Sequence, residues 1–415
     1  MSWAENSSQW HIIRRKAIDV DLEFDEDQEE LRESVRSFLQ AECPPGLVRK
    51  IVETGDPKAA EDLWSEMVSL DWPALSVPEE FGGVGLGFVE CAVVAEELGA
   101  VIAPGPYFPT VTQFTTVLRE LGTQEQKNRF IKSVVSGEIT GTLAVADHPR
   151  SWWGSQTQHS TTRAQMLEGR WILNGEKYAV IGGSSGSGVS GESSGPGAPG
   201  ADEVVVVAGT DNGVGVFVVP SSKLVWRQVR SLDATRDLYE LRIDSVEVPD
   251  DRVLGDPGTL GVGEGLARAV QEATVALALE TVGTCQTLFD LTLQYAKDRH
   301  QFGVPIGSFQ AVKHKMADMF VALERARSLC YYAVAAIAED DGSRSLATSM
   351  AKAAADDCQR LVCQESIQTF GGIGFTWEHD AHLFVKRAKS SGALFGSAVD
   401  HRRRISEILR AEATG

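Results

Sequence analysis

The sequence predicts a mainly α-helical protein with a central β domain. Three observations support this fold class: helical periodicity before residue 138, short β-rich runs from 138 to 254, and long amphipathic stretches from 255 onward. The chain has 415 residues, of which 43% are hydrophobic and 23% are charged, close to the averages for globular proteins. It is therefore long enough for several domains with large cores.

The first domain, residues 19–137, is expected to be helical, and residues 1–18 are expected to form an irregular tail. Leu31, Val35 and Phe38-Leu39 are spaced i, i+4, i+7 and i+8, which places them on one apolar helix face. Helical patterns recur over 62–70, 88–103, 110–121 and 124–136.

The second domain, residues 138–254, is expected to form an antiparallel β sheet. Its short runs are rich in Val, Ile, Leu and Thr and have no helical pattern between them. Asn174-Gly175 predicts a hairpin turn. Residues 182–200 are mostly Gly, Ser and Pro, a composition that predicts a flexible loop; a lid over a substrate is the alternative.

The third domain, residues 255–415, is expected to be a four-helix bundle. Gly, Pro and Asp breaks separate its long amphipathic stretches, as in an up-and-down bundle. These stretches are 264–298, 309–339, 343–370 and 378–411.

The charge and the cysteines exclude several classes of protein. With 39 basic and 58 acidic side chains the net charge is −19, which argues against nucleic acid as a partner. The six cysteines form no CxxC pair and have no histidine at zinc spacing, so no metal site is predicted. The sequence contains no run of about 18 apolar residues, so no membrane span is predicted. A cytoplasmic protein with reduced thiols is expected.

Five segments, in this order along the chain, resemble motifs of the acyl-CoA dehydrogenase family, and the resemblance covers roughly residues 20–410. They are LDWPALSVPEEFGGVGLGFVECAVVAEELG (70–99), LNGEKYAV (173–180), SLDATRDLYELRIDSVEVPDDRVLG (231–255), YAKDRHQFGVPIGSFQAVKHKMADM (295–319) and IQTFGGIGFTWEHDAHLFVKRA (367–388). The details are most similar to an actinobacterial-type branch found in lipid and steroid catabolism. The resemblance implies an FAD-dependent, usually tetrameric oxidoreductase. It removes the α proton of an acyl-CoA thioester, passes a hydride to the flavin and then reduces an electron-transfer flavoprotein.

The resemblance also implies which residues contact the cofactor. Arg299 matches an arginine that, in the family, contacts the pyrophosphate of FAD, often the FAD bound by a neighbouring subunit. A guanidinium can form two parallel bonds to phosphate oxygens. Glycines allow the backbone to approach a phosphate-bearing ligand. The residues that match the family's cofactor contacts are Arg299, Phe302, Gln310, Gln368, Gly371, Gly372 and Gly374.

The residues expected to contact the flavin ring differ from the family pattern. Where the family usually has Thr-Glu-Pro, this chain has Ala146-Asp147-His148-Pro149. Where the family has Trp-Ile-Thr, it has Ala179-Val180-Ile181. Two hydroxyl groups expected on the isoalloxazine are therefore absent.

The catalytic base is also missing from both positions that the family uses, which hold Phe395 and Ala273. Glu272 is adjacent to Ala273 but points about 100° away around the helix. Glu280 lies near the same helix face as Ala273, two turns later in a very apolar stretch, where burial would raise its pKa as a base requires. The alternative is that Glu280 has a structural role and pairs with a basic side chain.

Three hypotheses about function follow. The first is α,β-dehydrogenation of an acyl-CoA in lipid or steroid side-chain catabolism, by a homo-oligomer with an unusual base or by a heteromer with a paralogous subunit. The motifs that contact the FAD of a neighbouring subunit are intact, whereas the residues that contact the flavin ring within the chain depart from the family pattern. This combination favours the heteromer. The alternatives are a catalytically silent partner or scaffold subunit, and a flavin-dependent monooxygenase on the same fold.

Overall fold

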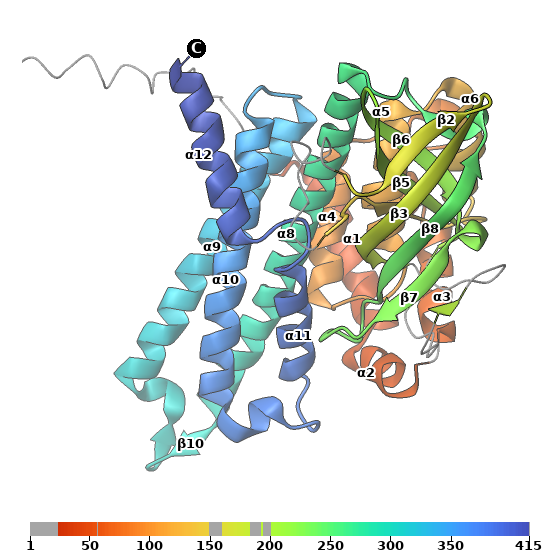
Figure 1. The fold of residues 1–415 in the computed structure, drawn as a ribbon. Helices are drawn as coiled ribbons and strands as arrows, with labels where there is room; N and C mark the ends of the chain where they lie inside the picture. The colour runs from red at the N-terminus through yellow and green to blue at the C-terminus, as the bar shows by residue number, and fades with distance from the viewer. Residues whose placement is uncertain (1–23, 56, 149–159, 183–191, 194–200, 415) are drawn as a thin grey trace, which may run out of the picture.

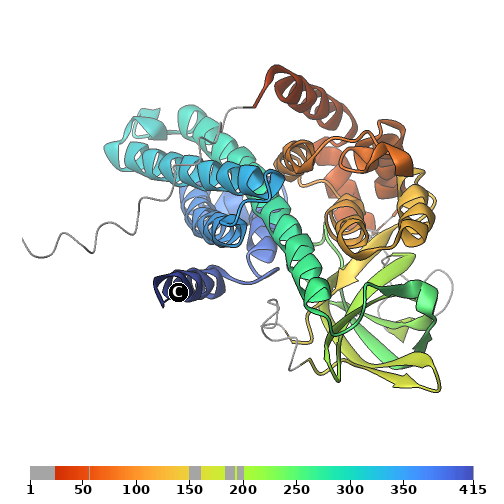
Figure 2. The ribbon, with the colours of Figure 1, turned by 90° about the horizontal axis from the view of Figure 1, so that it is seen from above.

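The computed structural model describes residues 24–55, 57–148, 160–182, 192–193 and 201–414. Figure 1 shows a helical bundle on one side and a β sheet with the N-terminal helices on the other, with the long helix α8 (Leu260–Asp298) between them. Figure 2 shows the same division from above. The predicted tail at 1–18 and most of the predicted loop at 182–200 lie outside the described residues.

The N-terminal helices occupy the chain before residue 138, as the periodicity predicts. The first helix begins at a capping box, in which Asp25 accepts from the Gln28 backbone N–H and the Gln28 side chain accepts from the Asp25 N–H. The helices are α1 (Glu26–Glu42), α2 (Pro45–Thr54), α3 (Lys58–Ser69), α4 (Phe88–Ala100), a π-helical segment (Phe108–Thr115) continuing as α5 (Thr116–Leu121), and α6 (Gln124–Gln126), a second π-helical segment (Lys127–Ile131) and α7 (Lys132–Val135).

Helix α4 packs against α8 through two glycines that bring the helix backbones into direct contact. A Cβ placed on Gly99 would lie 2.0 Å from the Glu280 carbonyl oxygen, and one on Gly283 would lie 2.0 Å from the Glu96 carbonyl oxygen. Only glycine permits this approach, so these positions fix how the N-terminal helices sit on the bundle.

The β domain is a mixed sheet, so the prediction of an antiparallel sheet is only partly correct. Its strands are ordered β4-β7-β8-β3-β2-β5-β6-β9, with β1 paired to β5 in parallel. The strands are β1 (Gly141–Ala144), β2 (Arg163–Leu167), β3 (Arg170–Ile181), β4 (Glu192–Ser193), β5 (Glu203–Thr210), β6 (Gly213–Pro220), β7 (Val225–Val229), β8 (Leu238–Val248) and β9 (Val253–Leu254).

The predicted hairpin turn at Asn174-Gly175 is wrong. Strand β3 runs through both residues, and the two-residue turn between β2 and β3 is Glu168-Gly169, with φ of 50° and 79°. At Gly175 the sheet register shifts, and a Cβ there would lie 2.5 Å from the Thr162 Cα. The glycine therefore serves a bulge and a close packing contact.

The C-terminal domain contains one more helix than predicted. The stretch 378–411 is broken between Gly392 and Ser397 into two helices, because the chain turns through Phe395 and Gly396, which both have positive φ. The elements after α8 are the short β10 (His300–Gln301) and β11 (Val304–Pro305), α9 (Gln310–Ala338), α10 (Arg344–Phe370), α11 (Ala381–Ser391) and α12 (Ala398–Thr414).

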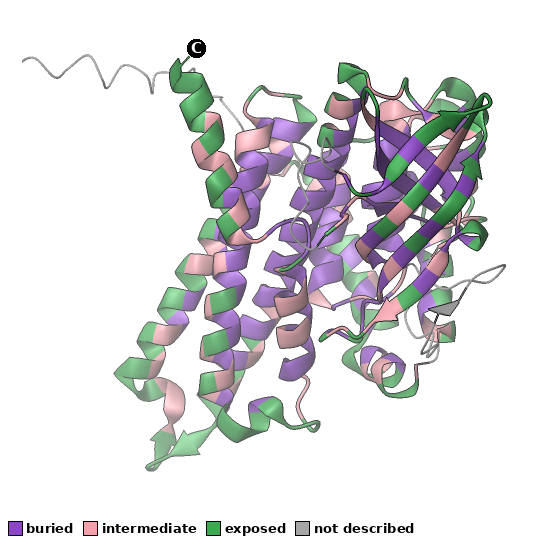
Figure 3. Ribbon diagram, in the orientation of Figure 1, coloured by how far each residue is buried: buried purple, intermediate pink, exposed green. Residues whose placement is uncertain are grey.

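Burial follows this arrangement, with α8 buried between the two halves and the outer faces of α9 and α12 exposed (Figure 3). All six cysteines are buried and unpaired. Within the described ranges, no helix combines the length and the apolar character needed to cross a lipid bilayer.

Candidate active site

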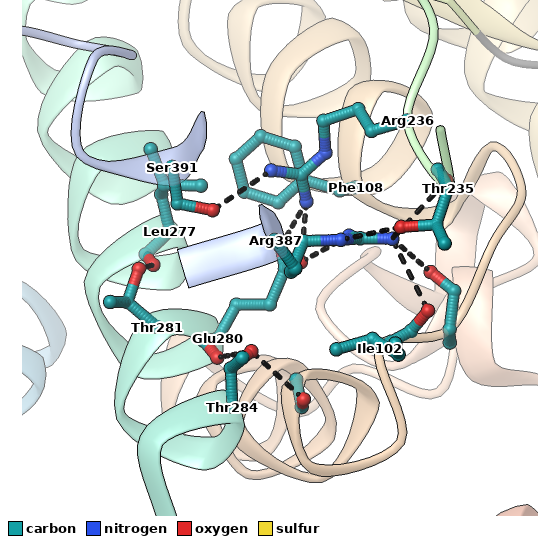
Figure 4. Close-up of polar contacts among 12 residues, drawn as sticks. Ile102, Phe108, Thr235, Arg236, Leu277, Glu280, Thr281, Thr284, Arg387 and Ser391 are labelled. Atoms are coloured by element: carbon teal, nitrogen blue, oxygen red, sulfur yellow. Dashed lines mark hydrogen bonds and ion pairs between the residues drawn. The ribbon is translucent and has the colours of Figure 1, made fainter. Parts of the chain in front are cut away.

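The candidate site is built around Glu280, which lies on α8 and is 4% exposed. Arg236 Nη2 donates to Glu280 Oε2 at 2.5 Å, and Arg387 Nη1 donates to Oε1 at 2.6 Å. Figure 4 shows both guanidinium groups directed at the carboxylate. Their side chains are 5% and 2% exposed, so this is a buried ion-pair cluster.

The turn before β8 brings one of these arginines to the bundle. Within it, Asp233 pairs with Arg387 Nε at 2.9 Å, and Thr235 accepts from both Arg387 Nε and Nη2 at 2.9 and 2.6 Å. Arg236 also donates to Ser391 Oγ on α11 at 3.3 Å. The cluster therefore ties the β domain to α8 and α11.

The expectation that Glu280 has a raised pKa is wrong. Burial alone would raise it, but the positive charges of Arg236 and Arg387 and their hydrogen bonds lower the pKa of Glu280 below its ordinary value. Burial lowers the pKa of Arg236. Burial also acts to lower the pKa of Arg387, but Asp233 and Glu280 together outweigh it and raise that pKa. In this arrangement Glu280 is an ionised, doubly paired carboxylate, which is the structural alternative that the sequence left open.

Glu272, the other candidate base, is also paired. Its Oε2 accepts from Arg119 Nη2 at 2.5 Å, and Arg119 Nη1 also donates to Ser76 at 3.3 Å. Ala273, at one of the two family base positions, is fully buried in the core.

Phe395 occupies the other family base position and is 2% exposed. Its φ is 54°, in the left-handed region that side chains rarely adopt. Its ring makes an edge contact with Phe108 at 6.4 Å between centroids, and its carbonyl oxygen accepts from His401 Nε2 at 2.9 Å. An apolar ring therefore fills the place where the resemblance predicts a carboxylate.

The cavity bordered by Glu280, Arg236, Phe108 and Ile181 has a volume of about 30 Å³. One water needs about 10–15 Å³ by this kind of measure, so the space accommodates one or two waters. It cannot accept a tricyclic ring or an acyl chain without movement of its walls.

The segments that would face a flavin ring are buried and apolar. Ala146 and Ile181 are 0% and 3% exposed and belong to the same hydrophobic cluster as Phe395. The neighbouring Asp147 forms an ion pair with the fully buried Lys177 and accepts from Thr162 Oγ1 at 2.8 Å. Burial would raise the pKa of Asp147, but Lys177 and the hydroxyl donors lower it. This acidic residue therefore stabilises the β domain.

The predicted cofactor contacts lie together at one end of the bundle, where α8 and α10 end and α9 begins (Figure 1). Arg299 caps the C-terminus of α8 and is exposed, Phe302 is 93% exposed, and Gln310 opens α9. Tyr295 near the end of α8 contacts Phe370 at the end of α10, with ring centroids 4.8 Å apart. Arg299 is 19 residues beyond Glu280, about 28 Å along the helix axis.

The glycine-rich segment after α10 differs in part from the prediction. Gly371 and Gly372 are exposed, and a Cβ on either would meet nothing within 4 Å. Gly374 is buried, and a Cβ there would lie 2.9 Å from the Phe370 Cβ. Gly374 therefore serves helix packing, and Gln368, Gly371 and Gly372 form the open part of the segment.

Comparison with known proteins agrees with this fold. Residues 25–138 match the model of the acyl-CoA dehydrogenase N-terminal domain, and residues 265–409 match that of the C-terminal domain. The mitochondrial isovaleryl-CoA dehydrogenase of Solanum tuberosum is 30% identical over 393 residues, which cover 90% of this chain and 88% of that protein. The chain belongs to the acyl-CoA dehydrogenase family. Acyl-CoA dehydrogenase IpdE2 of Mycobacterium tuberculosis is also 30% identical, with 92% and 98% of the two chains covered.

Two solved structures are similar over most of the chain. A variant of the Tcur3481-Tcur3483 steroid ACAD is 27% identical, with a TM-score of 0.79 and coverage of 94% of this chain and 99% of that one. The ChsE4-ChsE5 complex of Mycobacterium tuberculosis is 24% identical with a TM-score of 0.81 and the same coverage, and this likeness concerns the fold.

Acyl-CoA dehydrogenases are FAD-dependent oxidoreductases, and the two ends of this cofactor fit the chain differently. FAD supplies the hydride acceptor of the family's reaction when it is bound. The exposed Arg299 and the open backbone at Gly371 and Gly372 fit a pyrophosphate presented from outside the chain. The core around Ile181 and Phe395 does not fit the isoalloxazine.

Arg387 is the main site residue that the sequence reasoning missed. Leu383, Phe384, Arg387 and Ala388 have the spacing of one apolar helix face, and all four are buried. A cation on such a face requires a buried anion. That signal could have linked Arg387 to Glu280 before the structure was known.

Proposed function

We propose that this chain is one subunit of a heteromeric acyl-CoA dehydrogenase that carries out α,β-dehydrogenation of an acyl-CoA in lipid or steroid side-chain catabolism. A paralogous partner subunit holds the reacting flavin and the acyl-CoA. This chain contributes its exposed bundle end to the FAD of that partner, and electrons leave to an electron-transfer flavoprotein.

One observation carries the proposal: none of the base positions predicted among the described residues offers a free carboxylate. Phe395 fills the usual base position, and Glu280 and Glu272 are each paired with arginines. The likeness to the Tcur3481-Tcur3483 steroid ACAD supports a heteromer and a steroid-related acyl group. The same observation fits the catalytically silent partner subunit, and we take this chain to be such a subunit within an active complex. No feature of the described residues favours the monooxygenase.

The residues of this chain then have positioning roles. Arg299 and the Gly371-Gly372 backbone bind the pyrophosphate of the partner's FAD, with Phe302, Gln310 and Gln368 beside it. The Glu280 cluster holds the β domain against the bundle, and the apolar residues around Phe395 leave a cavity too small for flavin or acyl-CoA.

The flavin content of purified protein tests the proposal. The chain expressed alone is expected to carry no FAD, and the complex with its co-expressed paralogue about one FAD per two chains. Full FAD occupancy of the isolated chain, with bleaching by acyl-CoA under anaerobic conditions, would overturn the proposal.

A variant pair tests the assignment of the bundle end. Arg299→Ala in the complex is expected to weaken FAD binding at least about tenfold, because a hydrogen bond to a charged group is worth about 1.5–3 kcal/mol. Arg325→Ala removes an exposed arginine on α9 outside the matched motifs and serves as the control. Equal FAD affinity in both variants would contradict the assignment.

A further inference from the structure

A second cavity, of about 770 Å³, opens between α1, α2, α4, α8, α9 and α11 and shares no wall residue with the Glu280 cavity. We propose that it binds a neutral, apolar small molecule of lipid-like size. The proposal is independent of the function proposed above, because it involves neither the flavin-contacting residues nor the Glu280 cluster.

The floor of this cavity is apolar and firmly packed. Leu39 on α1, Val48 on α2, Ile102 after α4 and Phe384 on α11 are each at most 4% exposed, and the thiol of Cys43 lies among them. Burial raises the pKa of Cys43 to about 12, so the thiol is neutral and adds no charge to the floor. Such a surface favours an apolar ligand.

Two ion pairs on the wall already satisfy their own charges. Arg36 donates to both carboxylate oxygens of Glu97, at 3.0 and 2.7 Å, and Arg327 donates to Glu96 at 3.0 Å. Arg32 also lies 3.6 Å from Glu96. Arg36 and Arg327 are therefore not available to an anionic ligand without loss of an existing pair, whereas the buried Nε of Arg32 has no hydrogen-bond partner among the described residues.

The remaining charged groups on the wall are acidic. Asp290 accepts from the Gln286 amide at 3.0 Å, and an amide leaves its negative charge uncompensated. Asp380 pairs with Arg49, which lies outside the cavity lining. With Arg49 counted, four carboxylates stand beside four guanidinium groups, so the balanced local charge offers no net attraction to a carboxylate, phosphate or CoA thioester. A neutral, apolar ligand is compatible both with the charges on the wall and with the apolar floor.

The size and position of the cavity fit a small-molecule site. Its volume lies within the roughly 300–1,000 Å³ typical of ligand pockets. Its floor at Ile102 is held in place from the other side, because Arg387 Nη2 donates to the Ile102 and Ala103 carbonyl oxygens at 3.2 and 3.1 Å. The floor is thus preformed, which lowers the cost of binding.

Dye binding to the full-length chain, alone or in complex with its partner, tests the proposal. Nile red, which is neutral and apolar, is expected to bind with saturation, and 1-anilinonaphthalene-8-sulfonate, which is anionic, at least about tenfold more weakly. Gln40 is exposed at the cavity wall on α1, so Gln40→Trp is expected to fill the opening and weaken Nile red binding at least about tenfold.

Two matched variants separate the cavity from general effects of substitution. Ser37→Trp adds the same ring to an exposed position of α1 that does not line the cavity, and Gln40→Ala opens the wall. Both are expected to bind Nile red as the unmodified chain does. The proposal is overturned if the unmodified chain shows no saturable binding, if Gln40→Trp binds normally, or if the anionic dye binds as tightly as Nile red.

Discussion

Replacing Glu280 by glutamine is the sharpest test of the ion-pair cluster at the centre of the molecule. The substitution keeps the shape of the side chain but removes the charge that two buried guanidinium groups share through contacts of 2.5–2.6 Å. Asp233 then remains as the one carboxylate of the cluster beside Arg236 and Arg387. Removing one partner of a buried ion pair costs about 3–5 kcal/mol, and we expect a loss of this size in the free energy of unfolding.

Urea unfolding near pH 7 measures this loss. Glu264→Gln, at an exposed position of the same helix, is the control and is expected to change stability by less than about 0.5 kcal/mol. Adding Arg236→Met to Glu280→Gln should recover part of the loss, since it removes a guanidinium left without its partner. A loss below about 1 kcal/mol for Glu280→Gln, together with abolished bleaching by acyl-CoA, would refute the reasoning and identify Glu280 as a base.

Three further predictions concern stability. Burial lowers the pKa of His401 from 6.5 to about 4, so on acidification the unfolded chain binds this proton first and stability falls between pH 6.5 and 4. The loss is about 3 kcal/mol, and unfolding titrations of His401→Gln should lack it. Lys177→Met removes the cation beside the part-buried Asp147 carboxylate and should cost about 3–5 kcal/mol in urea unfolding, most of it restored when Asp147 is also neutralised. Gly283→Ala should lower the melting temperature although alanine favours helices, while Gly261→Ala on the same helix, with open space around it, should not.

The sequence predicted features that depend on neighbours along the chain. Apolar residues at helical spacing located α1 and the long bundle helices, and the predicted domain boundaries at 138 and 255 fall in the connections on either side of the sheet. The hairpin turn was misplaced because Asn174-Gly175 and Glu168-Gly169 both allow the required backbone, and only tertiary packing selects between them. The parallel pairing of β1 with β5 joins segments about 60 residues apart, which no local pattern records.

The candidate site shows the same limit. The apolar residues around Glu280 could be recognised in the sequence, and they correctly predicted that its side chain is buried. The sign of its pKa shift depends on Arg236 and Arg387, which are 44 and 107 residues away, so the sequence alone left both outcomes open. The cofactor contacts at the bundle end stay a prediction from motifs, and packing decided that Gly374 faces α10.

The glycine contact between α4 and α8 restricts how the molecule can move. Because the two backbones touch at Gly99 and Gly283, neither sliding nor rotation of one helix on the other is possible without collision. Helices α4 and α8 are therefore held in one relative position. The N-terminal helices and α8 meet the β domain in one apolar cluster that contains Ile181 and Phe395. Asp233, Thr235 and Arg236 add ion pairs and hydrogen bonds to this contact. Any motion that widened the small cavity beside Glu280 would therefore have to separate the sheet from this apolar cluster.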